Sequence, residues 1–91
     1  MKHVETNPYG HPETAARKLV EIAARIEPVQ DGRIYIERVN AAFVSLLNGS
    51  KGHPEFSAGI GYAVEKGWLW LHESGTYLKL MPPGEDLLTL R

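Results

Sequence analysis

The chain has 91 residues, enough for one small domain but not for two separate hydrophobic cores. Hydrophobic residues make up 43% of the sequence and charged residues 23%, proportions typical of a globular protein, so we expect the chain to fold unaided. Ten Lys and Arg against eleven Asp and Glu give a net charge of -1, which provides no general attraction for nucleic acid or for an anionic membrane.

Two absences from the sequence exclude further classes of protein. There is no cysteine, so disulfides, thiolate metal sites and thiol redox chemistry are excluded. The longest uncharged run, residues 39–50, is too short and too polar to span a bilayer, and the N-terminus has no apolar stretch after its lysine. We therefore expect a cytoplasmic protein that makes no contact with a membrane.

The first predicted element is a helix over residues 12–27, whose apolar residues recur with helical spacing and whose end is set by Pro28. Its predicted buried stripe consists of Ala16, Leu19, Val20, Ala23 and Ile26. Residues 1–11 contain turn-forming residues and no periodicity, so they are predicted to be a flexible N-terminal arm. The single domain is expected over residues 12–91.

The next elements are short. Residues 30–32, Gln-Asp-Gly, favour a turn, and residues 34–36, Ile-Tyr-Ile, favour an edge strand. A second helix is predicted over residues 37–47 and ends at the Asn-Gly-Ser-Lys-Gly sequence that follows. The residues spaced for burial in this helix are Val39, Asn40, Phe43, Val44 and Leu47.

A third helix is predicted over residues 54–66. A helical wheel places Phe56, Ile60, Ala63 and, less centrally, Val64 on its inward side. The outward side is predicted to hold Ala58, Gly61, Tyr62 and Glu65. A glycine costs a helix about 1 kcal/mol relative to alanine, so Gly59 indicates a close approach to another helix of the core.

After Gly67 the hydrophobic period changes to two, which predicts a β-hairpin with a two-residue turn at residues 74–75. In this register Leu71 lies opposite Leu78, Leu69 opposite Leu80 and Trp70 opposite Lys79. One face of the hairpin is then aliphatic and the other aromatic and polar. Residues 82–84, Pro-Pro-Gly, are expected to stop the strand, and residues 85–90 to form a short closing helical turn.

This fold, mainly α with a small β hairpin, resembles the winged helix: a helix, a short strand, two helices and a two-stranded antiparallel wing. The wing tip, residues 73–77, and the exit Leu-Lys-Leu-Met-Pro-Pro-Gly, residues 78–84, are similar to those of bacterial winged helix-turn-helix regulators, with methionine where threonine is usual. The chain is also similar to short, uncharacterised bacterial proteins of this kind, a likeness that implies no activity.

The resemblance implies a regulator of transcription that binds double-stranded DNA. Helix 54–66 would enter the major groove as the recognition helix, and the wing would contact the backbone or the minor groove. The free N–H groups at the start of that helix would favour a phosphate. The candidate DNA contacts are Lys51, His53, Ser57, Tyr62, Lys66, Thr76 and Lys79, and Arg33 and Arg38 beside the short strand could also reach the backbone.

The distribution of charge keeps a second interpretation open. Three lysines and three glutamates balance between Lys51 and Met81, and Glu65 on the outward face would repel phosphate. The alternative is a protein-interaction or homodimerisation module that keeps the winged-helix fold without binding DNA. Its candidate interface residues are Ala58, Gly61, Tyr62, Trp70 and Tyr77.

No pattern in the sequence indicates catalysis, a metal or a cofactor. The four histidines lie in separate segments, with no pair at the spacing that places two ligands on one helix face. Residues 48–52, Asn-Gly-Ser-Lys-Gly, match neither a nucleophile elbow nor a phosphate-binding loop. We therefore predict a protein that is not an enzyme and that uses no cofactor or metal.

Overall fold

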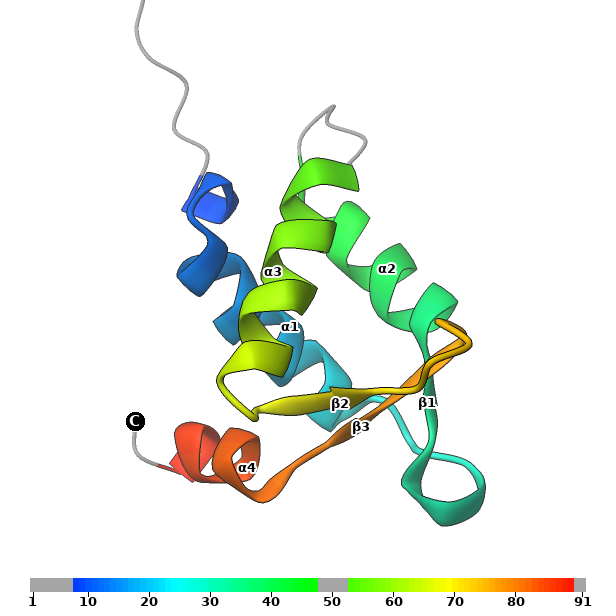
Figure 1. The fold of residues 1–91 in the computed structure, drawn as a ribbon. Coiled ribbons are helices and arrows are strands. Elements are labelled where there is room, and N and C mark those ends of the chain that lie inside the picture. The colour runs from blue at the N-terminus through cyan, green and yellow to red at the C-terminus, as the bar shows by residue number, and fades with distance from the viewer. Residues whose placement is uncertain (1–7, 48–52, 90–91) are drawn as a thin grey trace, which may run out of the picture.

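The computed structural model describes residues 8–47 and 53–89 of the chain. These residues form a mainly helical fold with a small antiparallel sheet, as the sequence predicts, and the sheet has three strands (Figure 1). The elements are α1 (Pro12–Arg25), β1 (Ile34–Tyr35), α2 (Ile36–Val44), α3 (His53–Glu65), β2 (Leu69–Leu71), β3 (Tyr77–Leu80) and α4 (Pro82–Thr89), with 3-10 turns at Pro8–Gly10 and Gln30–Gly32.

Helix α1 supplies the largest share of the core. The N–H groups in the first turn of a helix have no partner within the helix, so Pro12, which lacks this group, fits there. Glu13 complements the positive end of the helix dipole. The buried side chains are Ala15, Ala16, Leu19, Val20, Ile22 and Ala23, which include four of the five that the sequence predicts. The helix ends at Arg25, two residues before the predicted end, because a residue that precedes proline disfavours helical geometry and Glu27 precedes Pro28.

Helix α3 packs along α1 (Figure 1), and Gly59 lies at the closest approach. A Cβ atom on Gly59 would lie 2.8 Å from Leu19 Cδ1 and 2.9 Å from Ala15 Cβ, so the prediction of a close helix contact is confirmed. Ile60 and Ala63 are buried as expected. The inward placement of Val64 is wrong, since its side chain is 38% exposed, because Gly59 joins the buried stripe and shifts its centre away from Val64.

Helix α2 begins at Ile36, one residue earlier than predicted, so the preceding strand keeps only two residues. Phe43 is fully buried, with ring centroids 5.4 Å from Tyr9 and 5.9 Å from Phe56. Ordered packing therefore begins before Pro12, because Tyr9 of the first 3-10 turn lies against the core. The rest of the predicted arm, residues 1–7, lies outside the described residues.

The sheet has the strand order β1-β3-β2, and the predicted hairpin register is confirmed. Strand β1 pairs with β3, with Ile34 opposite Leu78 and Tyr35 opposite Tyr77. The two-residue turn at residues 74–75 is wrong. The N–H of Gly75 donates to the carbonyl of His72 over 2.9 Å, and Gly75 then takes a left-handed φ of 77°. The N–H of His72 also donates to the carbonyl of Tyr77 over 3.1 Å, so residues 73–76 connect the strands in the same register.

The end of the chain is more helical than the sequence suggests. Pro82 and Pro83 begin α4 instead of only ending the strand, because proline fits the first turn of a helix. Gly84 is buried where a Cβ atom would overlap the carbonyl oxygen of Trp68. Leu87 and Leu88 pack against the core, as expected. Across residues 8–47 and 53–89, no helix is long and apolar enough to cross a membrane.

Candidate functional site

The sheet separates an aliphatic face from an aromatic one, as predicted. Ile34, Leu69 and Leu78 are buried against the helices. Because side chains alternate along a strand and pair across the ladder, the opposite face carries a different set. This surface, called here the outer sheet face, consists of Arg33, Tyr35, Trp70, His72, Tyr77 and Lys79.

The rings of the outer sheet face form one connected cluster. His72 stacks on Tyr77, with ring centroids 4.5 Å apart and an interplanar angle of 19°. The Trp70 ring lies 5.7 Å from His72, edge to face, and 6.1 Å from Tyr77. Trp70 is 40% exposed, and Tyr35 on the other edge strand is 42% exposed. Trp70 of this cluster and Tyr35 beside it therefore remain open to a partner.

Two cations lie over these rings instead of beside carboxylates. Arg33 Cζ is 4.7 Å from the Tyr77 centroid, and Lys79 Nζ is 5.5 Å from the Trp70 centroid. Among the described residues neither cation forms an ion pair, and no strand residue on this face is acidic. The carboxylates nearest in sequence are Asp31 and Glu73 in the adjoining turns and Glu37 in the first turn of α2. The positive charge of the outer sheet face is thus not neutralised on the face itself.

The turn at Gln30–Gly32 fixes the position of Arg33. The N–H of Val29 donates to the Arg33 carbonyl over 2.8 Å, and the N–H of Arg33 donates back to the Val29 carbonyl over 2.9 Å. Closing so short a loop requires left-handed backbone at Asp31, with φ 47°, and at Gly32, with φ 82°. The turn chemistry of the sequence thereby sets the guanidinium beside the Tyr77 ring.

A chain of hydrogen bonds orients His72 and the hairpin turn. The backbone N–H of Ser74 donates to His72 Nδ1 over 3.0 Å, so this ring nitrogen is the acceptor. The Ser74 hydroxyl lies 2.8 Å from both His72 Nδ1 and the Thr76 hydroxyl. Thr76, a candidate DNA contact, thus uses its hydroxyl within the turn, and the stacked pair of His72 and Tyr77 is held in a defined orientation.

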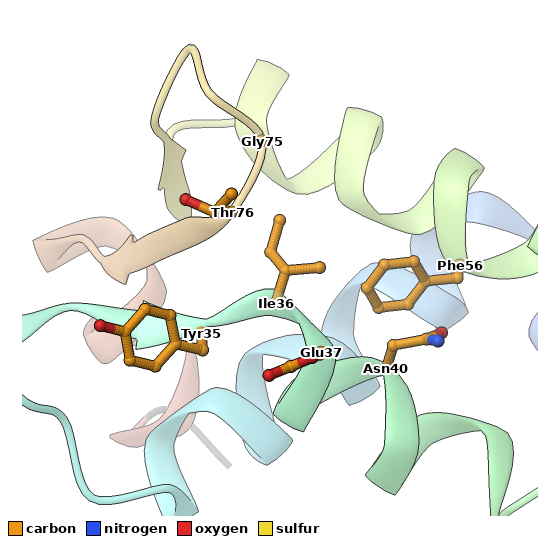
Figure 2. Close-up of a pocket in the computed structure, with 7 residues that line it drawn as sticks. All are labelled: Tyr35, Ile36, Glu37, Asn40, Phe56, Gly75 and Thr76. Carbon is orange, nitrogen blue, oxygen red and sulfur yellow. The ribbon is translucent and has the colours of Figure 1, made fainter.

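A pocket of about 620 Å³ lies between α2, the start of α3 and the hairpin turn (Figure 2). Its lining residues are Tyr35, Ile36, Glu37, Asn40, Phe56, Gly75 and Thr76. The N–H of Ile36 donates to the Thr76 carbonyl over 3.0 Å and ties the turn to the start of α2. Asn40 Oδ1 is buried without a hydrogen-bond partner among the described residues. The pocket adjoins the outer sheet face at Tyr35, which belongs to both.

The predicted recognition helix presents a different surface. Ser57, Ala58 and Gly61 are exposed on α3, as expected, together with Val64 and Glu65. Tyr62 is half-buried, with its ring centroid 5.7 Å from that of Trp68, and Lys66 Nζ lies 5.4 Å from the Tyr62 ring. Tyr62 therefore does not project freely from α3. Lys51 and the side chain of His53 lie outside the described part of the chain.

The predicted register already places Lys79 opposite Trp70 on the aromatic face of the hairpin, and the structure confirms this pairing. The sequence analysis nevertheless divided this face between two functions, with Lys79 as a candidate for DNA and Trp70 and Tyr77 as candidates for a protein interface. Tyr35 and His72 belong to the same face and were not among the candidates. The alternation of Trp70 with His72 along the hairpin could have indicated His72, whereas Tyr35 depends on the pairing of β1 with β3.

Comparison with known proteins finds no match to this chain among family models, curated proteins or solved structures. Within residues 8–47 and 53–89, no three His, Asp or Glu side chains gather where they could hold a metal ion.

Proposed function

We propose that this chain is a non-enzymatic winged-helix module of the regulator type and that it binds DNA. The order of a helix, a short strand, two helices and a hairpin is the order that the resemblance to winged helices implies, and it supports this assignment. Fold alone does not define a function, so the assignment to DNA needs support from a surface.

The observation that carries the proposal is the pair of cations, Arg33 and Lys79, on an exposed aromatic face without carboxylates. Such cations can displace counterions from phosphates. Helix α3 offers less, because its sequence from His53 to Glu65 contains no Arg, Lys, Asn or Gln, the residues that commonly reach base edges. We therefore place the DNA contact on the hairpin and the outer sheet face instead of on α3.

The number of cations sets the expected strength of this interaction. Two phosphate contacts give a logarithmic salt dependence of about -1.8 for duplex DNA, well below that of proteins that make many contacts. Binding through Arg33 and Lys79 should therefore be weak and easily lost at moderate salt.

The test is a titration of the isotopically labelled protein with a short duplex and with one of its strands, at low and at moderate salt, while backbone amide shifts are followed. We expect salt-sensitive shifts at Arg33, at Tyr35 and along residues 70–79. Replacing both Arg33 and Lys79 with Met should abolish them. Lys66→Met, which removes a cation at the end of α3, is the matched control and should leave them in place. The absence of shifts with either DNA at low salt would refute the proposal.

One feature of α3 favours a second candidate function, the protein-interaction or homodimerisation module. Ala58, Gly61 and Val64 form an exposed strip of small or apolar residues, and a Cβ atom on Gly61 would meet nothing within 4 Å. Such a strip can admit the close approach of a partner's helix. Sedimentation velocity at two protein concentrations tests self-association. If this strip is the interface, Gly61→Gln should abolish the association. If the outer sheet face is the interface, Trp70→Ala should abolish it.

A further inference from the structure

The two exposed rings of the outer sheet face lie on opposite edges of the same sheet. Tyr35 belongs to β1 and Trp70 to β2, with β3 between them. Neighbouring strands are about 4.8 Å apart and Tyr35 and Trp70 pair with β3 residues two positions apart, so the two residues are separated by roughly 10 Å across the strands and about 7 Å along them. The stacked pair of His72 and Tyr77 fills the space toward Trp70. The face therefore presents a row of rings, in which Trp70, His72 and Tyr77 are in contact and Tyr35 lies on the strand beside Tyr77, and not a single exposed aromatic side chain.

The row of rings is organised before any ligand arrives. Arg33 and His72 both contact Tyr77, and the hydrogen bonds from Ser74 fix the His72 ring. Aromatic side chains also have few rotatable bonds, so little conformational freedom is lost when another flat group stacks on them. A ligand with flat rings and negative charge fits this arrangement, because the rings can stack on it and the cations can meet its charge.

From this combination we infer that the outer sheet face binds single-stranded nucleic acid in preference to duplex. The inference depends on the proposed binding of DNA and names the form of nucleic acid that the site takes. In a duplex the faces of the bases are stacked on one another, so an intact duplex could engage only Arg33 and Lys79. An unpaired strand offers base faces to Trp70 and Tyr35 as well as phosphates to the two cations.

Charge argues against a second copy of the chain as the occupant of this face. In a symmetric dimer the same patch meets itself, so Arg33 and Lys79 of one copy would approach the same cations of the other. The carboxylates closest to the face in sequence lie at its border, with Asp31 and Glu73 on the adjoining turns and Glu37 in the first turn of α2. A bound polyanion would neutralise these cations, whereas self-association would bring them together.

The stacking contribution determines the expected effects of substitution. Alanine replacement of an aromatic residue that stacks on one base weakens binding to a single strand by about 5- to 150-fold. We expect losses in this range for Trp70→Ala and for Tyr35→Ala. Trp70→Phe keeps a ring at the same position and should retain most of the affinity. Val64→Ala, on the exposed side of α3, is the control and should have no effect.

The experiment uses the full chain carrying Trp68→Phe, so that Trp70 is the only tryptophan and reports on the outer sheet face. Trp68 itself lies between Tyr62 and Arg17, away from this cluster. The probes are an oligothymidine of about 15 nucleotides, near the upper end of known single-strand site sizes, and the same strand annealed to oligoadenine. We expect the single strand to quench Trp70 fluorescence and to bind at least about tenfold more tightly than the duplex, with a salt dependence near -1.4.

The outcomes separate this inference from the proposed function. Equal or tighter binding of the duplex, or binding of oligothymidine without a change in Trp70 fluorescence, overturns the preference for a single strand and leaves DNA binding intact. A failure of both probes to bind at low salt overturns the two together. Circular dichroism of each variant verifies its folding, and if Trp70→Ala does not fold, Tyr35→Ala on the other edge strand tests the stacking prediction independently.

Discussion

Replacing Gly59 with alanine tests the packing of α3 on α1. The added Cβ atom would lie 2.8 Å from Leu19 Cδ1, 2.9 Å from Ala15 Cβ and 3.2 Å from the Ala15 backbone carbon. Carbon atoms pack best at about 3.5–4.0 Å, so relief of the contact with Ala15 requires a shift of at least about 0.6 Å. The Leu19 methyl group can rotate away, but Ala15 belongs to the helix itself, so α1 and α3 must move apart.

The cost of this movement can be separated from helix propensity by a matched substitution. Overpacking of a core costs about 1–3 kcal/mol, whereas exchanging Gly for Ala within a helix gains about 1 kcal/mol. Gly61→Ala gains the same propensity and places its Cβ atom in open space. The difference in unfolding free energy between the two variants therefore isolates the packing cost, and we expect Gly59→Ala to be the less stable by about 1–3 kcal/mol.

Thermal and urea denaturation followed by circular dichroism measure this difference. Each kcal/mol corresponds to about 4–8 °C in Tm for a domain of this size. If the clash with Ala15 is the cause, the two substitutions are coupled. Adding Ala15→Gly to Gly59→Ala should then restore more stability than the effect of Ala15→Gly alone predicts. Equal Tm values for Gly59→Ala and Gly61→Ala would refute the reasoning, and so would a higher Tm for Gly59→Ala.

The remaining predictions concern the core, the exit of the hairpin and the outer sheet face. Phe43→Ala should lower the unfolding free energy by about 3–5 kcal/mol in urea denaturation, because the ring is fully buried against Tyr9 and Phe56, and a loss below about 1 kcal/mol would contradict this packing. Gly84→Ala should lower Tm through overlap with the Trp68 carbonyl, at a cost of about 1–3 kcal/mol, and an unchanged Tm would contradict the contact. For binding of a single strand, Lys79→Met should reduce the logarithmic salt dependence by about 0.7, whereas Lys66→Met should leave it unchanged, and the reverse result would place the phosphate contact on α3.

The parts of the fold that were predicted correctly are those that the residue pattern of a single segment determines. The alternation of residues along the hairpin determines its register, because a shift by one residue would expose Leu69 and Leu78. Helix ends differ from the predicted ones by up to three residues, since the final turns depend on local geometry as well as on composition. The pairing of β1 with β3 could not be predicted, because Ile34 and Tyr35 are too few to specify a partner so distant in sequence.

The candidate site was predicted in fragments for the same reason. The predicted register places Lys79, Trp70 and Tyr77 on one face of the hairpin, but residue type divided them between DNA and a protein partner. Pairing of β1 with the centre of the sheet adds Tyr35 to that face and brings Arg33 to the Tyr77 ring. The site is therefore a property of the sheet topology, and no single segment of the sequence contains it.

The same distribution explains why a net charge of -1 does not decide whether this protein binds nucleic acid. Two of the three cations of α1 are neutralised locally: Arg17 Nη2 lies 3.0 Å from Glu13 Oε2, and Lys18 Nζ lies 2.9 Å from Glu21 Oε1. On the outer sheet face Arg33 and Lys79 lie over rings, which attract a cation without cancelling its charge. Exposed charges are screened within about 10 Å at ordinary salt, so a bound strand senses the charges on and around the outer sheet face, including Asp31 and Glu73 of the adjoining turns, more than the charges across the molecule. The local arrangement, and not the sum over the chain, therefore governs the attraction for phosphate.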